Sequence, residues 1–323
     1  MSFNTNKLVQ SDDVRAVMEP AAKSGLLPIA NRLVRYYNTF LKDSIRIFLR
    51  DRLAVAGLIV IFGFVLVAIF APWIAPYDEF VKNLLPDGRL ARLQPPSSQF
   101  YFGTTDLGRD IFSQIVMGSR IALMVGLVAS AIITVIGTIV GLISGYYGGW
   151  VDNLLMRIVD ILYSIPFIPF VIVTVSLVRP NIWNIMFAVT LLAWRSVARI
   201  IRAQVLSIVQ RPYIKAARVA GAGDLRIMFI HIAPNVLPLA FLEMAFMIGW
   251  AIITEASISF IGFGDPSMIS WGQTLNDCFL SGAIRVAWWW IIPPGMSIVI
   301  VVSSVFLITR GLEDVNNPRL RRR

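Results

Sequence analysis

Long runs without a charged residue constrain this chain more than any other feature of its sequence. Three of them, at 53–77, 121–151 and 286–309, are long and apolar enough to cross the roughly 30 Å of a bilayer's hydrocarbon as helices. Only 15% of the 323 residues are charged and 57% are apolar, whereas about a quarter of an ordinary soluble domain is charged. The sequence therefore predicts an integral membrane protein.

Three further stretches, at 154–178, 182–205 and 227–260, are apolar but contain a few charged residues. Each is longer than the roughly 18 residues that a transmembrane helix needs. Together with the three charge-free runs, they predict six transmembrane helices in an all-α fold.

Prolines interrupt two of these stretches. Proline lacks a backbone N–H and breaks or kinks a helix. We therefore expect Pro234 and Pro238 to divide the last of the three into an approach segment and a span. Pro166 and Pro169 lie inside the third span, where we expect a fixed kink, with a translocation-linked hinge as the alternative.

The positions of the basic residues orient the spans. Twenty-two of the 29 Lys and Arg residues lie within 1–52, at Arg157, within 195–226 or after the last span. By the positive-inside rule, both termini are cytoplasmic and residues 78–119 face outward. The net charge of +10 sits between apolar runs instead of on a hydrophilic face, which argues against a nucleic-acid partner.

These features divide the chain into four parts. Residues 1–52 form a cytoplasmic segment whose apolar and basic residues recur at helical spacing, as expected of an amphipathic helix on the lipid surface or packed on its own protein. Residues 53–119 contain the first transmembrane helix and an extracytoplasmic loop. Residues 120–312 form the core with a cytoplasmic loop near 210–226, and 313–323 form a cytoplasmic basic tail.

The cytoplasmic loop has the features of a short exposed helix. Pro212 suits the first turn of a helix, and Ala216 and Ala217 give that helix a small-residue face that another protein could approach closely. Gly221 allows a sharp turn after it. Asp224 is placed to cap the following helix with its carboxylate.

At this loop the sequence resembles a known family. Lys215-Ala216-Ala217, followed by Gly221 and by His231-Ile-Ala-Pro234, is similar to the EAA loop of ABC-importer permeases. Several other ordered motifs are similar to the C-type permease subunit of dipeptide/oligopeptide (peptide/nickel) importers: 102–112, 145–152, 156–160, 255–262, 270–272 and 311–319. The resemblance covers roughly residue 48 to the end.

The resemblance implies a type I ABC permease fold in the bacterial inner membrane. It implies a heterodimer with a homologous permease, two ATP-binding subunits that bind ATP and Mg²⁺, and an extracytoplasmic solute-binding protein. Lys215, Ala216, Ala217 and Gly221 would belong to the segment that docks on the ATPase. The family usually has Glu at the position of Lys215, so either the partner is acidic there or Lys215 lies at the rim. Peptide is the leading substrate, with oligosaccharide and nickel left open.

The chain lacks the groups that catalysis or a cofactor would need. None of its five lysines follows a glycine, which excludes a GxxxxGK[ST] phosphate-binding loop. Its single cysteine, Cys278, and single histidine, His231, exclude an internal disulfide and a multi-histidine metal site. We therefore expect no enzymatic activity and no cofactor in this chain, with ATP hydrolysis on separate subunits.

Charged residues inside the predicted spans are candidate functional groups, because charges in a bilayer usually face protein or water. Asp160 lies three residues after Arg157 and could pair with it. Glu243 is a candidate for the transport pathway or an inter-subunit contact, with a hydrogen bond to a neighbouring helix as the alternative. Glu255 is expected to make a helix-packing or gate contact that Ser257 and Ser259 could satisfy.

Two other classes of protein remain as alternatives. A proton-coupled secondary transporter could use Glu243 or Asp160 as its carrier site, but it leaves the cytoplasmic loop unexplained. An intramembrane enzyme is disfavoured because no nucleophile–base pair or metal cluster stands out in the spans.

Overall fold

The computed structural model describes residues 48–316. The chain divides into two units at residues 50 and 51, and every helix discussed below belongs to the second unit, within residues 51–316. The predicted amphipathic segment within 1–52 and most of the predicted tail at 313–323 lie outside the described residues.

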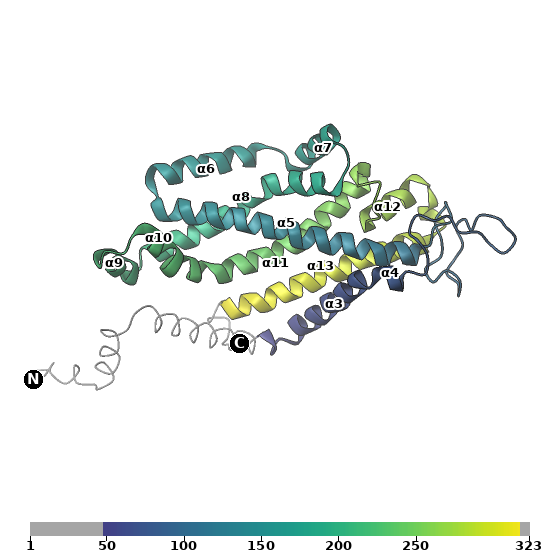
Figure 1. Ribbon diagram of the computed structural model, residues 1–323, viewed down its shortest axis with the longest axis horizontal. Helices are drawn as coiled ribbons and strands as arrows, with labels where there is room; N and C mark the ends of the chain where they lie inside the picture. The colour runs from purple at the N-terminus through teal and green to yellow at the C-terminus, as the bar shows by residue number, and fades with distance from the viewer. Residues whose placement is uncertain (1–47, 317–323) are drawn as a thin grey trace, which may run out of the picture. The chain divides into compact units, whose positions relative to one another are not determined.

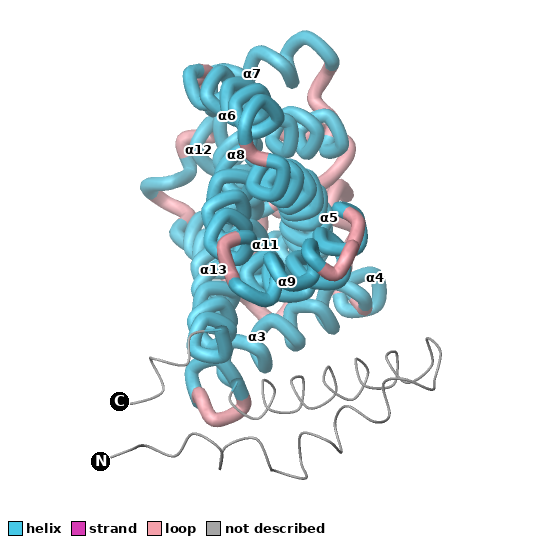
Figure 2. The backbone as a smooth tube through the Cα atoms, turned by 90° about the vertical axis from the view of Figure 1, so that its left-hand side faces the viewer, coloured by secondary structure: helices cyan, strands magenta, loops and turns pink. Residues whose placement is uncertain are grey.

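Long apolar helices make up most of this second unit, as predicted (Figure 1). Within residues 48–316, five helical stretches are long and apolar enough to cross a membrane, or six if a bent pair counts as one span. The five are α3 (Arg52–Ile69), α5 (Ile111–Tyr147), α8 (Ile182–Val209), the continuous stretch Asp224–Phe263 that contains α11 (Ala233–Ile258), and α13 (Trp288–Asn316). Figure 2 shows helices and connecting loops, with no strand drawn in the described part of the chain.

The bent pair corrects the predicted third span. α6 (Gly149–Ser164) and α7 (Phe167–Val178) meet at 83°, which is a break and not the kink expected within one helix. Pro166 precedes α7 and has no N–H to continue α6, and Ile165 before it is extended with ψ of 121°.

Two other predicted boundaries also change. α5 begins at Ile111 instead of residue 121, because the carboxylate of Asp110 caps its first turn by accepting from Ser113 N–H at 2.8 Å. Pro238 lies inside α11 and does not divide it, so the break expected there is wrong. Pro234 does mark a boundary: it lies in the first turn of α11, directly after the π-helical turn η3 (Ile227–Ile232).

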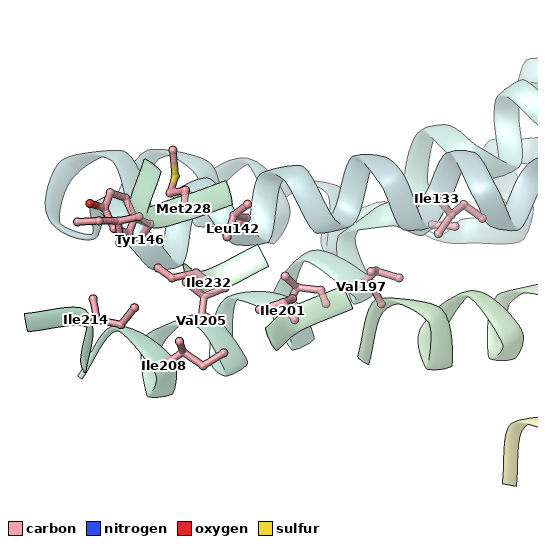
Figure 3. Close-up of a cluster of buried hydrophobic side chains, with 14 of the residues drawn as sticks. Ile133, Leu142, Tyr146, Val197, Ile201, Val205, Ile208, Ile214, Met228 and Ile232 are labelled. Carbon is pink, nitrogen blue, oxygen red and sulfur yellow. The ribbon is translucent and has the colours of Figure 1, made fainter. Parts of the chain in front are cut away.

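Small residues let α5 and α8 pack at close range. Gly137, Gly141 and Gly145 recur every fourth residue, and a Cβ on any of them would come within 2.7 Å of an atom of α8. Towards one end, this interface continues into a cluster of buried apolar side chains from α5, α8 and η3, shown in Figure 3.

The long helices place two different surface regions at opposite ends of the unit (Figure 1). The α9 end (residues 210–226) contains α9 (Pro212–Val219) and α10 (Asp224–Arg226). The α12 end contains the loop 75–110 and residues 264–287, which include α12 (Trp271–Leu280).

Candidate functional site

α9 is a short helix with well-defined limits. Pro212 occupies its first turn, as the sequence predicted. After its last turn, Gly221 adopts φ of +82°, while Gly221 N–H donates to the Arg218 carbonyl at 3.0 Å and Ala222 N–H donates to the Ala217 carbonyl at 3.1 Å. This pair of bonds is a Schellman motif, which favours glycine at the left-handed position.

One apolar side chain anchors α9 to the rest of the unit. Ile214 is 1% exposed and lies in the buried cluster with Ile208 of α8 and Met228 of η3 (Figure 3). On other sides of the helix, Lys215 and Ala216 are exposed and Ala217 is half-buried. Lys215 makes no ion pair with any residue in the described part of the chain. α9 therefore presents a small, accessible surface on a fixed base.

Asp224 does not cap a helix, contrary to the sequence prediction. The cap of α10 is Gly223, which makes no side-chain bond. The Asp224 carboxylate instead accepts a hydrogen bond of 2.7 Å from the hydroxyl of Tyr146, near the end of α5. The Arg218 guanidinium lies 5.9 Å from the centroid of the same tyrosine ring. This contact joins the α9 end directly to a long helix.

Asp160 pairs with a different partner from the one predicted. Its carboxylate lies 2.5 Å from Arg199 of α8, not on Arg157 of its own helix. The Arg199 guanidinium lies 4.0 Å from the centroid of the Tyr163 ring, and Arg195 lies 4.6 Å from it.

A second ion pair joins the same two helices and was missed from the sequence. Arg202 of α8 donates to both carboxylate oxygens of Asp152 at 2.5 Å, and Ser144 of α5 also donates to Asp152. The sequence does contain a pattern that indicates ion pairs between these helices: α6 has two acidic residues, and α8 has three arginines at i, i+4 and i+7. These pairs fix α6 against α8.

The two glutamates of α11 differ in their surroundings. Glu255 is 2% exposed and accepts a hydrogen bond of 2.6 Å from Ser259, as expected, while Ser270 at the start of α12 also hydrogen-bonds its carboxyl group. Ser257 bonds a backbone carbonyl instead. Glu243 is 9% exposed and has no hydrogen bond or ion pair with a described residue, so the alternative of a bond to a neighbouring helix finds no partner in residues 48–316.

Comparison with known proteins places the whole chain in one family. Residues 137–322 match the family described as binding-protein-dependent transport system inner membrane component, and residues 39–96 match the N-terminal TM domain of oligopeptide transport permease C. The chain is 36% identical over 307 residues to the oligopeptide transport system permease protein OppC of Bacillus subtilis (strain 168), a match that covers 95% of this chain and 98% of that protein. It is 39% identical over 290 residues to the dipeptide transport system permease protein DppC of Escherichia coli (strain K12), covering 88% and 94%. This chain therefore belongs to the inner-membrane permease components of binding-protein-dependent ABC transport systems and has their type I permease fold.

Proposed function

We propose that this chain is the permease subunit of an ATP-driven importer of di- or oligopeptides. The two relatives described above are named as permeases of an oligopeptide and a dipeptide transport system, and each is matched over most of its length. We expect a homologous permease as heterodimer partner, two ATP-binding subunits that carry ATP and Mg²⁺, and an extracytoplasmic protein that delivers the peptide.

The observation that carries this proposal is the construction of the α9 end. A helix with an exposed small-residue surface is backed by buried Ile214, and the turn that follows it is joined to α5 through the bond between Tyr146 and Asp224. If an ATPase subunit binds this surface and moves, the displacement passes to the long helices through those two contacts. That gives ATP-driven closure a route to switch the pathway between its two sides.

Glu243 fits a role that involves another part of the complex. A carboxylate that is 9% exposed in the middle of a transmembrane helix is costly without a partner. Because no described residue pairs with it, we propose that it faces the second permease or the transport pathway. Asp160 and Glu255 have partners within the chain and are assigned structural roles.

The proposal requires the α9 end to face the cytoplasm. A cysteine at exposed Ser98, in the loop 75–110, should react with a membrane-impermeant thiol reagent added outside, and one at exposed Ser207, near the end of α8, should not. The native Cys278 gives little background because it is fully buried, and because burial, with a smaller effect of Asp106, raises the pKa of its thiol to about 11. The opposite labelling pattern contradicts the orientation.

Uptake by the assembled complex tests the function itself. We expect the tagged chain to co-purify with ATP-binding subunits and, with the solute-binding protein added, to import radiolabelled dialanine into proteoliposomes only when ATP is supplied. The chain alone should hydrolyse no ATP, since it has no phosphate-binding loop. Import driven by a proton gradient without ATP contradicts the proposal and favours the secondary-transporter alternative. If the complex imports an oligosaccharide or nickel with ATP but imports no peptide, the importer function stands and the proposed peptide substrate is wrong.

A further inference from the structure

A cavity of about 500 Å³ opens at the α12 end. It lies between the loop residues 105–109, the start of α5, the length of α12 and the start of α13. Phe80, Leu280 and Trp290 supply apolar wall, and charged and amide side chains supply the rest. A cavity of this size and mixed lining is typical of small-molecule sites.

The charged side chains of this cavity make no side-chain hydrogen bond or ion pair with the described part of the chain. Arg109 makes no side-chain hydrogen bond or ion pair, its Nε is buried without an acceptor, and its guanidinium lies 5.6 Å from the centroid of the Phe80 ring. The carboxylates of Asp106 and Asp277 likewise accept no hydrogen bond. Burial raises the pKa of Asp277, while the charge of Arg109 lowers it and that of Asp106 raises it further. The three charges are therefore close enough to influence one another, yet none neutralises another by direct contact.

Gln114 provides an independent sign that the cavity is built for a ligand. It is only 1% exposed and lines the cavity. Its Nε2 donates to the Glu79 carbonyl at 3.2 Å, but its Oε1 has no donor among the described residues. An amide oxygen on a cavity wall that has no donor within the protein is free to accept a hydrogen bond from a ligand.

We propose that this cavity binds the zwitterionic backbone of a short peptide, with the peptide carboxylate at Arg109 and its ammonium group between Asp106 and Asp277. The Oε1 of Gln114 is a further acceptor for the ammonium. This assignment rests on the proposed function, to which it adds a reception site on the permease itself.

The charge pattern distinguishes this ligand from simpler ions. A divalent metal ion would leave Arg109 without a partner of opposite charge, and a simple anion would be repelled by the two carboxylates. A ligand that carries both charges pairs with all three side chains at once, and charge-assisted bonds in a partly dry cavity are the stronger kind.

Peptides with blocked ends test the assignment on the unaltered protein. The complex, purified through a tag on this chain and washed free of solute-binding protein, is titrated calorimetrically with dialanine, N-acetyl-dialanine, dialanine amide and the doubly blocked peptide. Each block should weaken binding by about tenfold or more, because each removes one charge-assisted contact. Equal binding of the free and the doubly blocked peptide, or no binding of dialanine, overturns the assignment.

Variants then assign each end of the peptide to its side chain. Arg109→Gln should bind dialanine and dialanine amide equally. Asp277→Asn should prefer dialanine over N-acetyl-dialanine less than the unaltered protein does, because Asp106 remains as a partner for the ammonium group. Arg109→Lys keeps the charge and should keep part of the preference for a free carboxylate. Arg89→Gln is the matched control, since Arg89 lies in the same loop, is exposed, and pairs with Asp87 at 3.6 Å outside the cavity. Unchanged discrimination in Arg109→Gln and Asp277→Asn overturns the assignment.

Failure of this inference and failure of the proposed function give different results. If ATP-driven peptide uptake occurs but free and blocked peptides bind alike, the cavity assignment is wrong and the importer stands. If the complex binds free dialanine selectively but imports no peptide with ATP, the importer is wrong and the cavity assignment stands.

Discussion

The two ends of the helix bundle hold their surface elements in different ways. At the α9 end, the eight-residue helix α9 has one buried side chain, Ile214, and the following turn, α10, is held by the hydrogen bond between Tyr146 and Asp224. At the α12 end, Trp271 is 1% exposed, its indole N–H donates to the Ile115 carbonyl at 3.0 Å, and Gly272 packs against the backbone of Ala256. One element is attached at a few points, and the other is embedded in the protein.

This difference has a consequence for how a displacement travels. An element with few attachments moves as a unit when a partner binds it, and it acts on the core only through those attachments. An embedded element moves only if the helices around it move. We therefore expect changes at the α9 end to alter coupling with little loss of stability, and changes at the α12 end to alter stability first.

The largest expected effect is the loss of Trp271. Trp271→Ala removes a buried indole that contacts Phe64 and the chain at Gly118, and should lower the free energy of unfolding by about 3 to 5 kcal/mol. Unfolding is followed with a thiol-reactive dye that reacts with Cys278, which is fully buried in the folded chain. Trp73→Ala is the control, because Trp73 is 77% exposed. A similar loss in both variants contradicts the view that α12 is embedded.

How much of this architecture the sequence predicts depends on the range of the interaction. The lengths of the apolar runs predict the spans, and the Pro212 and Gly221 signals predict both limits of α9 because each acts within a few residues. Hydropathy does not predict the break at Pro166. An apolar stretch that contains a proline has the same hydropathy whether the helix bends slightly or by 83°.

The contacts that the sequence does not predict join residues far apart in the chain. Tyr146 and Asp224 are separated by 78 residues, and Asp160 and Arg199 by 39. Arg157 is the nearer partner for Asp160 along one helix, but it is Arg199 of the neighbouring helix α8 that pairs with the carboxylate. Such pairings depend on which helices are neighbours and on their relative rotation, which one sequence does not specify. The cavity at the α12 end is missed for the same reason.

At the α9 end, the largest expected effect comes from Gly221. Gly221→Val forces a β-branched residue into a left-handed conformation, at a cost of about 1 to 3 kcal/mol. The surroundings are open, since no atom outside residues 220–222 lies within 4 Å of the position that a Cβ would occupy. Backbone strain and contact with the partner are therefore the sources of the effect. Transport should fall and ATPase association should weaken, while insertion and pairing with the second permease stay normal.

The matched control for this position is Gly221→Asn, because asparagine tolerates the left-handed region far better than valine. It should keep most of the uptake of radiolabelled dialanine by the reconstituted complex. Wild-type uptake by the valine variant at normal complex levels would remove the coupling role assigned to this turn.

A smaller effect is expected at the connection between α9 and α5. Tyr146→Phe removes the hydroxyl that donates to Asp224 but keeps the ring beside Arg218. The carboxylate of Asp224 is exposed and regains water, so the free energy of unfolding should fall by only about 1 kcal/mol. ATP hydrolysis should continue while the number of peptides imported per ATP decreases. Tyr147→Phe, which changes a half-exposed neighbour without a hydroxyl partner among the described residues, should leave that ratio unchanged.

The smallest expected effect is at Lys215, where this chain departs from the glutamate usual in its family. Lys215 is exposed and makes no ion pair within residues 48–316, and an exposed ion pair with a partner would contribute only about 0 to 1 kcal/mol. We therefore expect Lys215→Glu to change uptake by less than about fivefold. Lys215→Gln separates the loss of a positive charge from the gain of a negative one. If Lys215→Glu abolishes uptake, Lys215→Gln reduces it, and the loss depends on salt, then Lys215 contacts an acidic groove on the ATPase and does not lie at its rim, because screening by salt acts on charged contacts of this kind.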